Sequence, residues 1–177
     1  MFGHEEISMR PIEAQDLEKV RKLRNEQSTW QYLSDASLIS ESMQHQWFDN
    51  LTRTLDERYY TIEKKKGGTF LGVIRTDQID FKNRSIRVGC DIILSERGKG
   101  FGTMAFQMIL RYFFIYNSFH RIWLCVLENN EIAKKLYINV GFKEEGKLRE
   151  AIWREGKWKD YIVMSILEDE YRGKNAL

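Results

Sequence analysis

The chain has 177 residues, of which 42% are hydrophobic and 31% are charged, and its formal net charge is +2. This composition excludes a disordered chain and a strongly basic nucleic-acid-binding surface, and we expect one globular domain over residues 1–177. No stretch has the pattern of a signal peptide or of a membrane-spanning helix, so we expect a cytoplasmic protein without a membrane partner.

The first half of the chain predicts one strand and two helices, followed by a meander of three strands. Residues 67–68 are a Gly-Gly pair of the kind that closes a hairpin, and residues 82–84 form a second turn. The stretch 30–38 has no clear pattern. The expected elements are a strand at 7–10, helices at 17–24 and 40–51, and strands at 58–63, 69–74 and 85–93.

The second half predicts two further helices, a strand between them, and a long terminal hairpin. The nearly continuous apolar run at 122–127 is typical of a central strand that is covered on both faces. Cys90 and Cys125 lie in strands, far from any metal-binding motif, and we interpret them as free core thiols. The expected elements are helices at 101–113 and 131–140, a strand at 122–127, and hairpin strands at 142–152 and 161–167.

A glycine-rich run lies between the third strand of the meander and the next helix. Glycine permits a tight turn and removes the side chain that would keep an anion away, so successive N–H groups can converge on phosphate oxygens. The helix that follows adds the positive end of its dipole. The run therefore predicts a pyrophosphate site. Its residues are Arg97, Gly98, Lys99, Gly100, Phe101, Gly102 and Thr103.

Two better-known phosphate motifs do not fit this run. A P-loop requires GxxxxGK followed by Ser or Thr, which the chain lacks. A dinucleotide-binding fingerprint requires GxGxxG early in a βαβ unit, whereas these glycines follow as GxGxG after three antiparallel-looking strands. The glycines alone also fit an ordinary turn that binds no ligand, and this is the alternative interpretation.

A second motif makes the interpretation specific. Asn130, Ala133 and Tyr137 follow as Asn-x-x-Ala-x-x-x-Tyr, and a Gly-Phe pair closes the helix at 141–142. Together with the glycine-rich run, this pattern resembles the GCN5-related N-acetyltransferase (GNAT) superfamily, which uses acetyl-CoA. The hairpin at 145–160 is similar to the branch of ribosomal-protein, polyamine and amino-sugar N-acetyltransferases.

The resemblance covers residues 7–170 and implies both a fold and a reaction. The implied fold is of the α/β (α+β) class, with a central mixed, mostly antiparallel sheet of about seven strands flanked by about four helices. The implied reaction transfers an acetyl group from acetyl-CoA to a primary amine by direct attack on the thioester. We expect acetyl-CoA as co-substrate and no metal.

The resemblance also implies roles for single residues. The glycine-rich run binds the CoA pyrophosphate, while Cys90, Asp91 and Ile92 pair with pantetheine like an added strand and offer one N–H to the thioester oxygen. Tyr137 lies about two turns after Asn130, on the same helix face, and acts as the general acid for the leaving thiolate. From the residues alone, Asn130 is also a plain helix cap and Tyr137 a half-buried aromatic.

The sequence leaves several candidates for the general base. In relatives that acetylate ribosomal protein termini, a glutamate often stands five residues before the asparagine, where this chain has Cys125. We expect Cys125 in the core and not as a base. Asp91 is the nearest candidate base, and its alternatives are a carboxylate that merely ends a strand or a proton path through water.

In the family, the first two helices border the acceptor site, so we expect Arg24, Asn25 and Trp47 there. With the strand turn at 77–83, these residues most resemble enzymes acting on nucleotide-linked 4-amino sugars, in which Arg24 would meet a phosphate and Trp47 would stack on a ring. The alternative places Arg24 at a solvated helix end and Trp47 in the core.

Three functions therefore remain after the sequence is read. An N-acetyltransferase for a small amine or amino sugar comes first. A protein N-terminal or polyamine N-acetyltransferase is the alternative, and a CoA-binding module without catalysis is the third. We expect no nucleic-acid partner. The sequence leaves open whether the protein forms a homodimer, because Trp153 and Trp158 on the hairpin suit either an interface or an acceptor wall.

Overall fold

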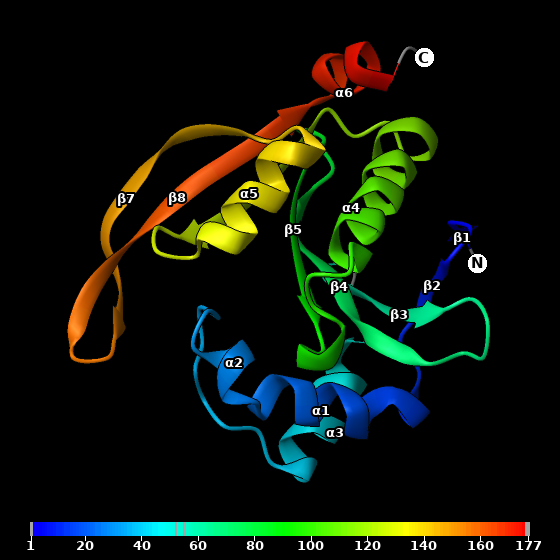
Figure 1. The fold of residues 1–177 in the computed structure, drawn as a ribbon, viewed down its shortest axis with the longest axis vertical. Helices are drawn as coiled ribbons and strands as arrows, with labels where there is room; N and C mark the ends of the chain where they lie inside the picture. The colour runs from blue at the N-terminus through cyan, green and yellow to red at the C-terminus, as the bar shows by residue number, and fades with distance from the viewer. Residues whose placement is uncertain (1, 52, 55, 176–177) are drawn as a thin grey trace.

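A mixed sheet organises the protein, seen in a computed structural model that describes residues 2–51, 53–54 and 56–175 (Figure 1). Its eight strands follow the order β1-β2-β3-β4-β5-β6-β8-β7. All neighbours are antiparallel except β5 and β6, which confirms the predicted mixed, mostly antiparallel sheet. The strands are β1 Phe2–Gly3, β2 Ile7–Pro11, β3 Arg58–Lys64, β4 Phe70–Asp80, β5 Ser85–Ile92, β6 Arg121–Leu127, β7 Lys143–Arg154 and β8 Lys157–Leu167.

Six α-helices lie in the described residues, and the four longest correspond to the predicted ones. The π-helical turn Tyr112–Tyr116 extends α4. The sequence did not predict α2, which is a single turn, or the polar α6, although three acidic residues at 168–170 mark the start of α6. The helices are α1 Leu17–Asn25, α2 Gln27–Trp30, α3 Glu41–Leu51, α4 Phe101–Arg111, α5 Glu131–Val140 and α6 Glu168–Asn175. None of them is long and apolar enough to cross a membrane.

The two faces of the sheet carry separate cores. Ile74 packs into the larger core with α4 and α5, whereas its neighbour Val73 packs into a smaller core with α1 and α3. Successive side chains of a strand point to opposite faces, so the two helix groups cover opposite sides of the sheet. Figure 1 shows the consequence: α1, α2 and α3 gather at one end of the molecule, apart from α4 and α5.

The parallel strands β5 and β6 separate soon after they pair. They pair only through residues 85–87 of β5 and residues 121–123 of β6. Along β6, Leu124 and Val126 are buried, but Trp123 and Cys125 are only half-buried. The prediction that this strand is covered on both faces is therefore wrong, as is the core position of Cys125. One face of β6 lines a cavity, since α1 and α3 pack against β3 and β4 and do not reach β6.

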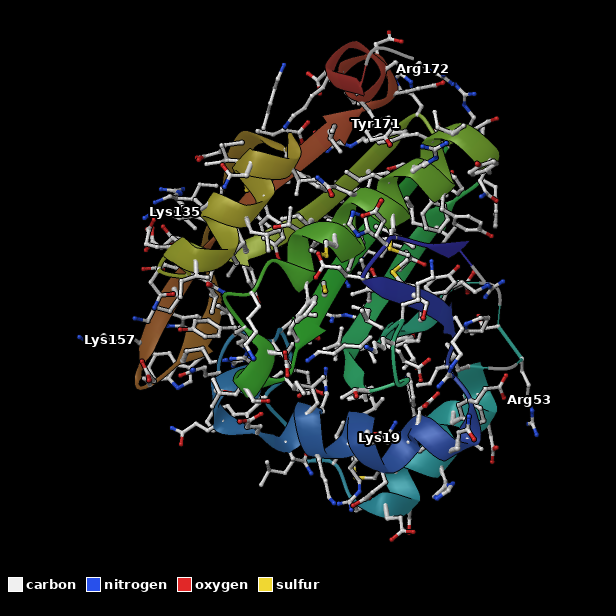
Figure 2. The ribbon with its side chains drawn as sticks, turned by 45° about the vertical axis from the view of Figure 1, so that its right-hand side comes forward. Lys19, Arg53, Lys135, Lys157, Tyr171 and Arg172 are labelled. Atoms are coloured by element: carbon white, nitrogen blue, oxygen red, sulfur yellow. The ribbon has the colours of Figure 1, made fainter. Side chains whose placement is uncertain are left out.

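The terminal hairpin extends away from the body of the molecule (Figure 1). Glu155 and Gly156 both have positive φ, 52° and 73°, as the predicted two-residue turn requires. Lys157 lies at the outer tip (Figure 2). Beside it, Trp153 and Trp158 pack edge to face with centroids 5.2 Å apart and stay about half exposed, at 52% and 56%.

Candidate active site

A cavity of about 1450 Å³ lies where β5 and β6 diverge. The glycine-rich run and α5 form one wall, and the cavity-facing side chains of β4, β5 and β6 form its floor. The segment that follows α1 and the hairpin strands β7 and β8 complete the border. The cavity thus joins the predicted cofactor residues to the region where an acceptor was expected.

The glycine-rich run has the backbone conformation that was predicted for an anion site. Gly98 and Gly100 have φ of 76° and 87°, a left-handed conformation that costs glycine little, and Gly100 is the N-cap of α4. Within the described chain, no group accepts a hydrogen bond from the backbone N–H groups of residues 98–103. These donors and the α4 dipole meet at the cavity wall and suit a pyrophosphate.

The charged side chains of the run are already engaged with the protein. Arg97 donates from Nε to the Ile92 carbonyl (2.8 Å) and from Nη2 to the Thr29 hydroxyl (2.7 Å). Lys99 donates to Glu96 (3.1 Å) and is outside the set of cavity-lining residues. The groups at this wall that are free to meet an anion are therefore backbone N–H groups.

The end of β5 offers an open edge to the cavity. Cys90 and Asp91 pair on one side with β4, and no pairing with β6 exists on the other side. Both residues and Ile92 line the cavity. An extended chain such as pantetheine fits this gap, because a strand with one open edge can accept a further strand-like partner.

Asn130 and Tyr137 line the cavity from α5. Asn130 caps the helix, with Oδ1 accepting from the Ala133 N–H at 3.2 Å. The Tyr137 ring packs against Phe106 and Phe142, at centroid distances of 5.2 and 5.9 Å. Burial raises the pKa of the Tyr137 hydroxyl, so this group is protonated at neutral pH and can donate a proton.

The thiols near the split are not activated. Burial raises the pKa of Cys90 well above its usual range, and it also raises the pKa of Cys125. Neither thiol is therefore a thiolate at neutral pH. This state favours direct transfer to an amine over a covalent acyl-cysteine route.

Two ion pairs cross between β4 and β5 on the cavity floor, and the sequence reasoning missed both arginines. Arg75 Nη1 contacts Asp91 Oδ2 at 2.6 Å, and Arg87 Nη2 contacts Asp77 Oδ2 at 3.0 Å. Gly89 makes room for the first pair, since a Cβ there would lie 2.9 Å from the Arg75 guanidinium carbon. The polar residues at alternate positions of both strands were the available signal.

The structure separates the three residues predicted to border the acceptor. Arg24 lines the cavity, and its Nε is buried without a partner in the described chain. Asn25 instead binds both backbone groups of Ile39, each at 2.8 Å. Trp47 packs edge to face on Tyr59, at 4.7 Å, in the smaller core. Trp47 therefore occupies the core position that was its alternative.

The described residues contain no group of three His, Cys, Asp or Glu side chains placed to hold a metal ion. The cavity offers backbone donors, an open strand edge and a protonated phenol. These features fit acetyl-CoA by its pyrophosphate, its pantetheine and its leaving sulfur.

Known proteins are similar to this chain in sequence. The spermidine N(1)-acetyltransferase of Vibrio cholerae is 26% identical over 170 residues, which are 96% of this chain and 98% of the relative. The Escherichia coli K12 protein of the same name is 27% identical and covers 93% and 88%. YdaF of Bacillus subtilis, provisionally named a ribosomal N-acetyltransferase, is 26% identical and covers 97% and 96%.

A solved structure agrees closely with the fold. The Vibrio cholerae spermidine N-acetyltransferase in complex with CoA and spermine superposes with a TM-score of 0.90 at 26% identity, covering 95% of this chain and 99% of that one. The family model for the acetyltransferase (GNAT) domain matches residues 6–143, well over half of the chain. The chain belongs to the GNAT family and is an acetyl-CoA-dependent N-acetyltransferase.

Proposed function

We propose that this enzyme acetylates a terminal primary amine of a linear polyamine. Two relatives named spermidine N(1)-acetyltransferases match nearly the whole chain, which supports a polyamine better than the nucleotide-linked amino sugar of the sequence prediction. The core position of Trp47 removes the ring that was expected to stack on a sugar or base. The proposed acceptor is therefore a small-molecule amine.

The observation that carries the proposal is an acidic recess next to the cavity. It measures about 430 Å³, and it shares Asp77, Gln78 and Arg87 with the larger cavity. Asp77 and Arg87 neutralise each other, but no lysine or arginine of the described chain pairs with Asp56 or Glu57 in the same recess. Two uncompensated carboxylates suit the distal ammonium of a long polyamine whose other end reaches the split strands.

The chemistry needs a proton donor for sulfur and an acceptor for the proton of the amine. As the nitrogen bonds to the acetyl carbon and the carbon–sulfur bond breaks, the Tyr137 hydroxyl donates its proton to the leaving sulfur. Asp91 Oδ2 is held by Arg75, while Oδ1 has no partner in the described chain. We assign Oδ1 as the proton acceptor, either directly or through water.

An acceptor panel tests this function. Release of free CoA thiol is measured with spermidine, 1,4-diaminobutane, butylamine and a nucleotide-linked 4-amino sugar. We expect spermidine to be the best acceptor and butylamine, which has no second ammonium, to be poor. Faster turnover of the amino sugar would overturn the proposal.

The recess itself is tested by Glu57→Gln. Because an exposed ion pair contributes roughly 0.2–1 kcal/mol, KM for spermidine should rise about 1.4- to fivefold, with no change for butylamine. Glu155→Gln at the hairpin tip is the matched control, and it should change neither the KM for spermidine nor the KM for butylamine. An equal rise for butylamine would show that Glu57 does not act on a distal charge.

A protein N-terminus is the second candidate acceptor. The similarity to YdaF supports it, as does the width of the cavity, which reaches from Ser34 beside α2 to Leu148 and Ala151 on the hairpin. Short peptides with free N-terminal serine or alanine, added to the panel, decide between the two. Peptide turnover above that of spermidine would favour this candidate.

A further inference from the structure

The segment that follows α1 is held over the cavity by arginines from other parts of the chain. We call residues 27–35 the acceptor-side segment. Arg154 of β7 donates to the Ser34 carbonyl at 3.0 Å, and Arg24 donates to the Asp35 carbonyl at 3.3 Å. Arg97, from the glycine-rich run, donates to the Ser28 carbonyl at 2.9 Å and to the Thr29 hydroxyl at 2.7 Å.

Arg97 is the arginine that also touches the cofactor side of the cavity. Its Nε donates to the Ile92 carbonyl at the end of β5, and its backbone directly precedes Gly98. The guanidinium therefore joins the end of β5 and the anion-binding loop to the start of α2. Thr29, which receives one of these hydrogen bonds, is only 4% exposed, so the contact is shielded from competing water.

The acceptor-side segment depends on such contacts for its order. α2 is a single four-residue turn, and a helix of this length is not stable without tertiary support. Residues 28, 29 and 31–34 line the cavity. The Ser28 hydroxyl is buried there without a partner in the described chain. A buried, unpaired hydroxyl at a cavity wall is suited to bind a ligand.

We propose that Arg97 is a positioning residue that couples cofactor binding to the order of the acceptor-side segment. A pyrophosphate bound to the N–H groups of residues 98–103 restricts the left-handed loop, and thereby the Arg97 backbone next to it. The restricted guanidinium then holds Ser28 and Thr29 at the cavity wall. Acetyl-CoA thus prepares the wall that meets the acceptor, an inference that rests on the acceptor binding in this cavity.

Amide hydrogen exchange with CoA as the probe tests the coupling without any acceptor. The amides of Gln31, Tyr32 and Leu33 are hydrogen bonded within the segment and report its opening. In the wild type, saturating CoA should slow their exchange about fivefold or more, as expected for coupled sites. In Arg97→Lys, which keeps the charge but loses the fork of donors, CoA should still protect residues 101–104 but no longer the segment.

Two further variants keep the test decisive. Thr29→Val removes only the hydroxyl that Arg97 binds, and it should weaken the CoA-dependent protection in the same way. Arg154→Lys is the control, because it loosens the segment from the hairpin side and should leave the response to CoA intact. The inference is overturned if CoA does not protect the segment in the wild type, or protects it equally in Arg97→Lys and Thr29→Val.

The same variants separate this inference from the proposed function. If spermidine is an acceptor, Arg97→Lys should raise its KM at saturating acetyl-CoA about fivefold or more, since coupling acts on both ligands. If spermidine is not acetylated while CoA still protects the segment through Arg97, the proposed acceptor is wrong and the coupling stands.

Discussion

The two ends of the cavity are built in different ways. The loop at residues 98–103, the proposed anion-binding site, is continuous in the chain, and the donors it offers are backbone N–H groups. The acceptor-side segment is positioned by side chains that lie far away in the sequence, 69 residues for Arg97 to Ser28 and 121 for Arg154 to Leu33. A cofactor site made of local backbone can stay constant while the distant contacts of the acceptor site change.

The largest effect is expected at the Tyr137 hydroxyl, which lies between the two ends of the cavity. Tyr137→Phe removes the hydroxyl without changing the ring packing against Phe106. Loss of a general acid lowers kcat by about 100-fold or more, while KM for acetyl-CoA should not change. Steady-state kinetics measures this, and Tyr116→Phe at an exposed position is the control. Unchanged turnover would revive a CoA-binding module without catalysis.

The next effect concerns the stability of the acceptor end, where Asp16 anchors the start of α1. This carboxylate is 1% exposed and accepts hydrogen bonds from Arg10, from the Glu13 N–H and from Thr61. Asp16→Asn breaks a buried ion pair and should lower the free energy of unfolding by about 3 kcal/mol at neutral pH. Urea denaturation measures the loss, with Glu155→Gln as the control.

This effect should depend on pH. Burial alone raises the pKa of Asp16, but the hydrogen bonds from Arg10, Glu13 and Thr61 outweigh burial, and the net pKa lies below its ordinary value. A lowered folded-state pKa stabilises the protein above the unfolded-state pKa, and the gain is lost as pH falls through the folded value. The difference between wild type and Asp16→Asn should therefore shrink in acid. A constant difference would show that the charge of Asp16 contributes nothing.

A smaller effect is expected in the cofactor loop. Gly100→Ala forces a residue with a Cβ into a left-handed conformation, which costs about 1–2 kcal/mol. The Kd for CoA, measured by calorimetry, should rise about 5- to 30-fold. Gly146→Ala is the matched control, because Gly146 has neither a positive φ nor a neighbour within 4 Å of the added Cβ. Equal CoA binding in both variants would argue against the backbone site.

The smallest effect is expected from Asn25→Ala on the acceptor end. Asn25 fixes the backbone of Ile39 just before α3, and water can replace part of these two hydrogen bonds at a half-buried site. KM for the acceptor should rise about threefold while KM for acetyl-CoA stays the same. If Asn25→Ala changed only the KM for acetyl-CoA, Asn25 would act on the cofactor end and the prediction would be wrong.

The sequence was sufficient to predict the parts of the fold that depend on local pattern. Hydrophobic spacing located the four long helices, and Gly-Gly and Glu-Gly pairs located the hairpin turns. It missed α2 because one helical turn has no period to detect. It also placed Cys125 in the core, since an apolar run does not reveal that one face of its strand borders a cavity.

By itself, the sequence determined the local structure of the proposed cofactor end: the glycine turn at residues 97–103 and the helix that begins after Asn130 and carries Tyr137 follow from backbone preference and helix spacing. Only the tertiary structure decided which side chains meet at the proposed acceptor end. Pairing of β4 with β5 brings Arg75 to Asp91 and Arg87 to Asp77. The physical reason is that backbone conformation depends on adjacent residues, whereas ion pairs and cavity walls depend on strand register and on side chains that meet only after folding.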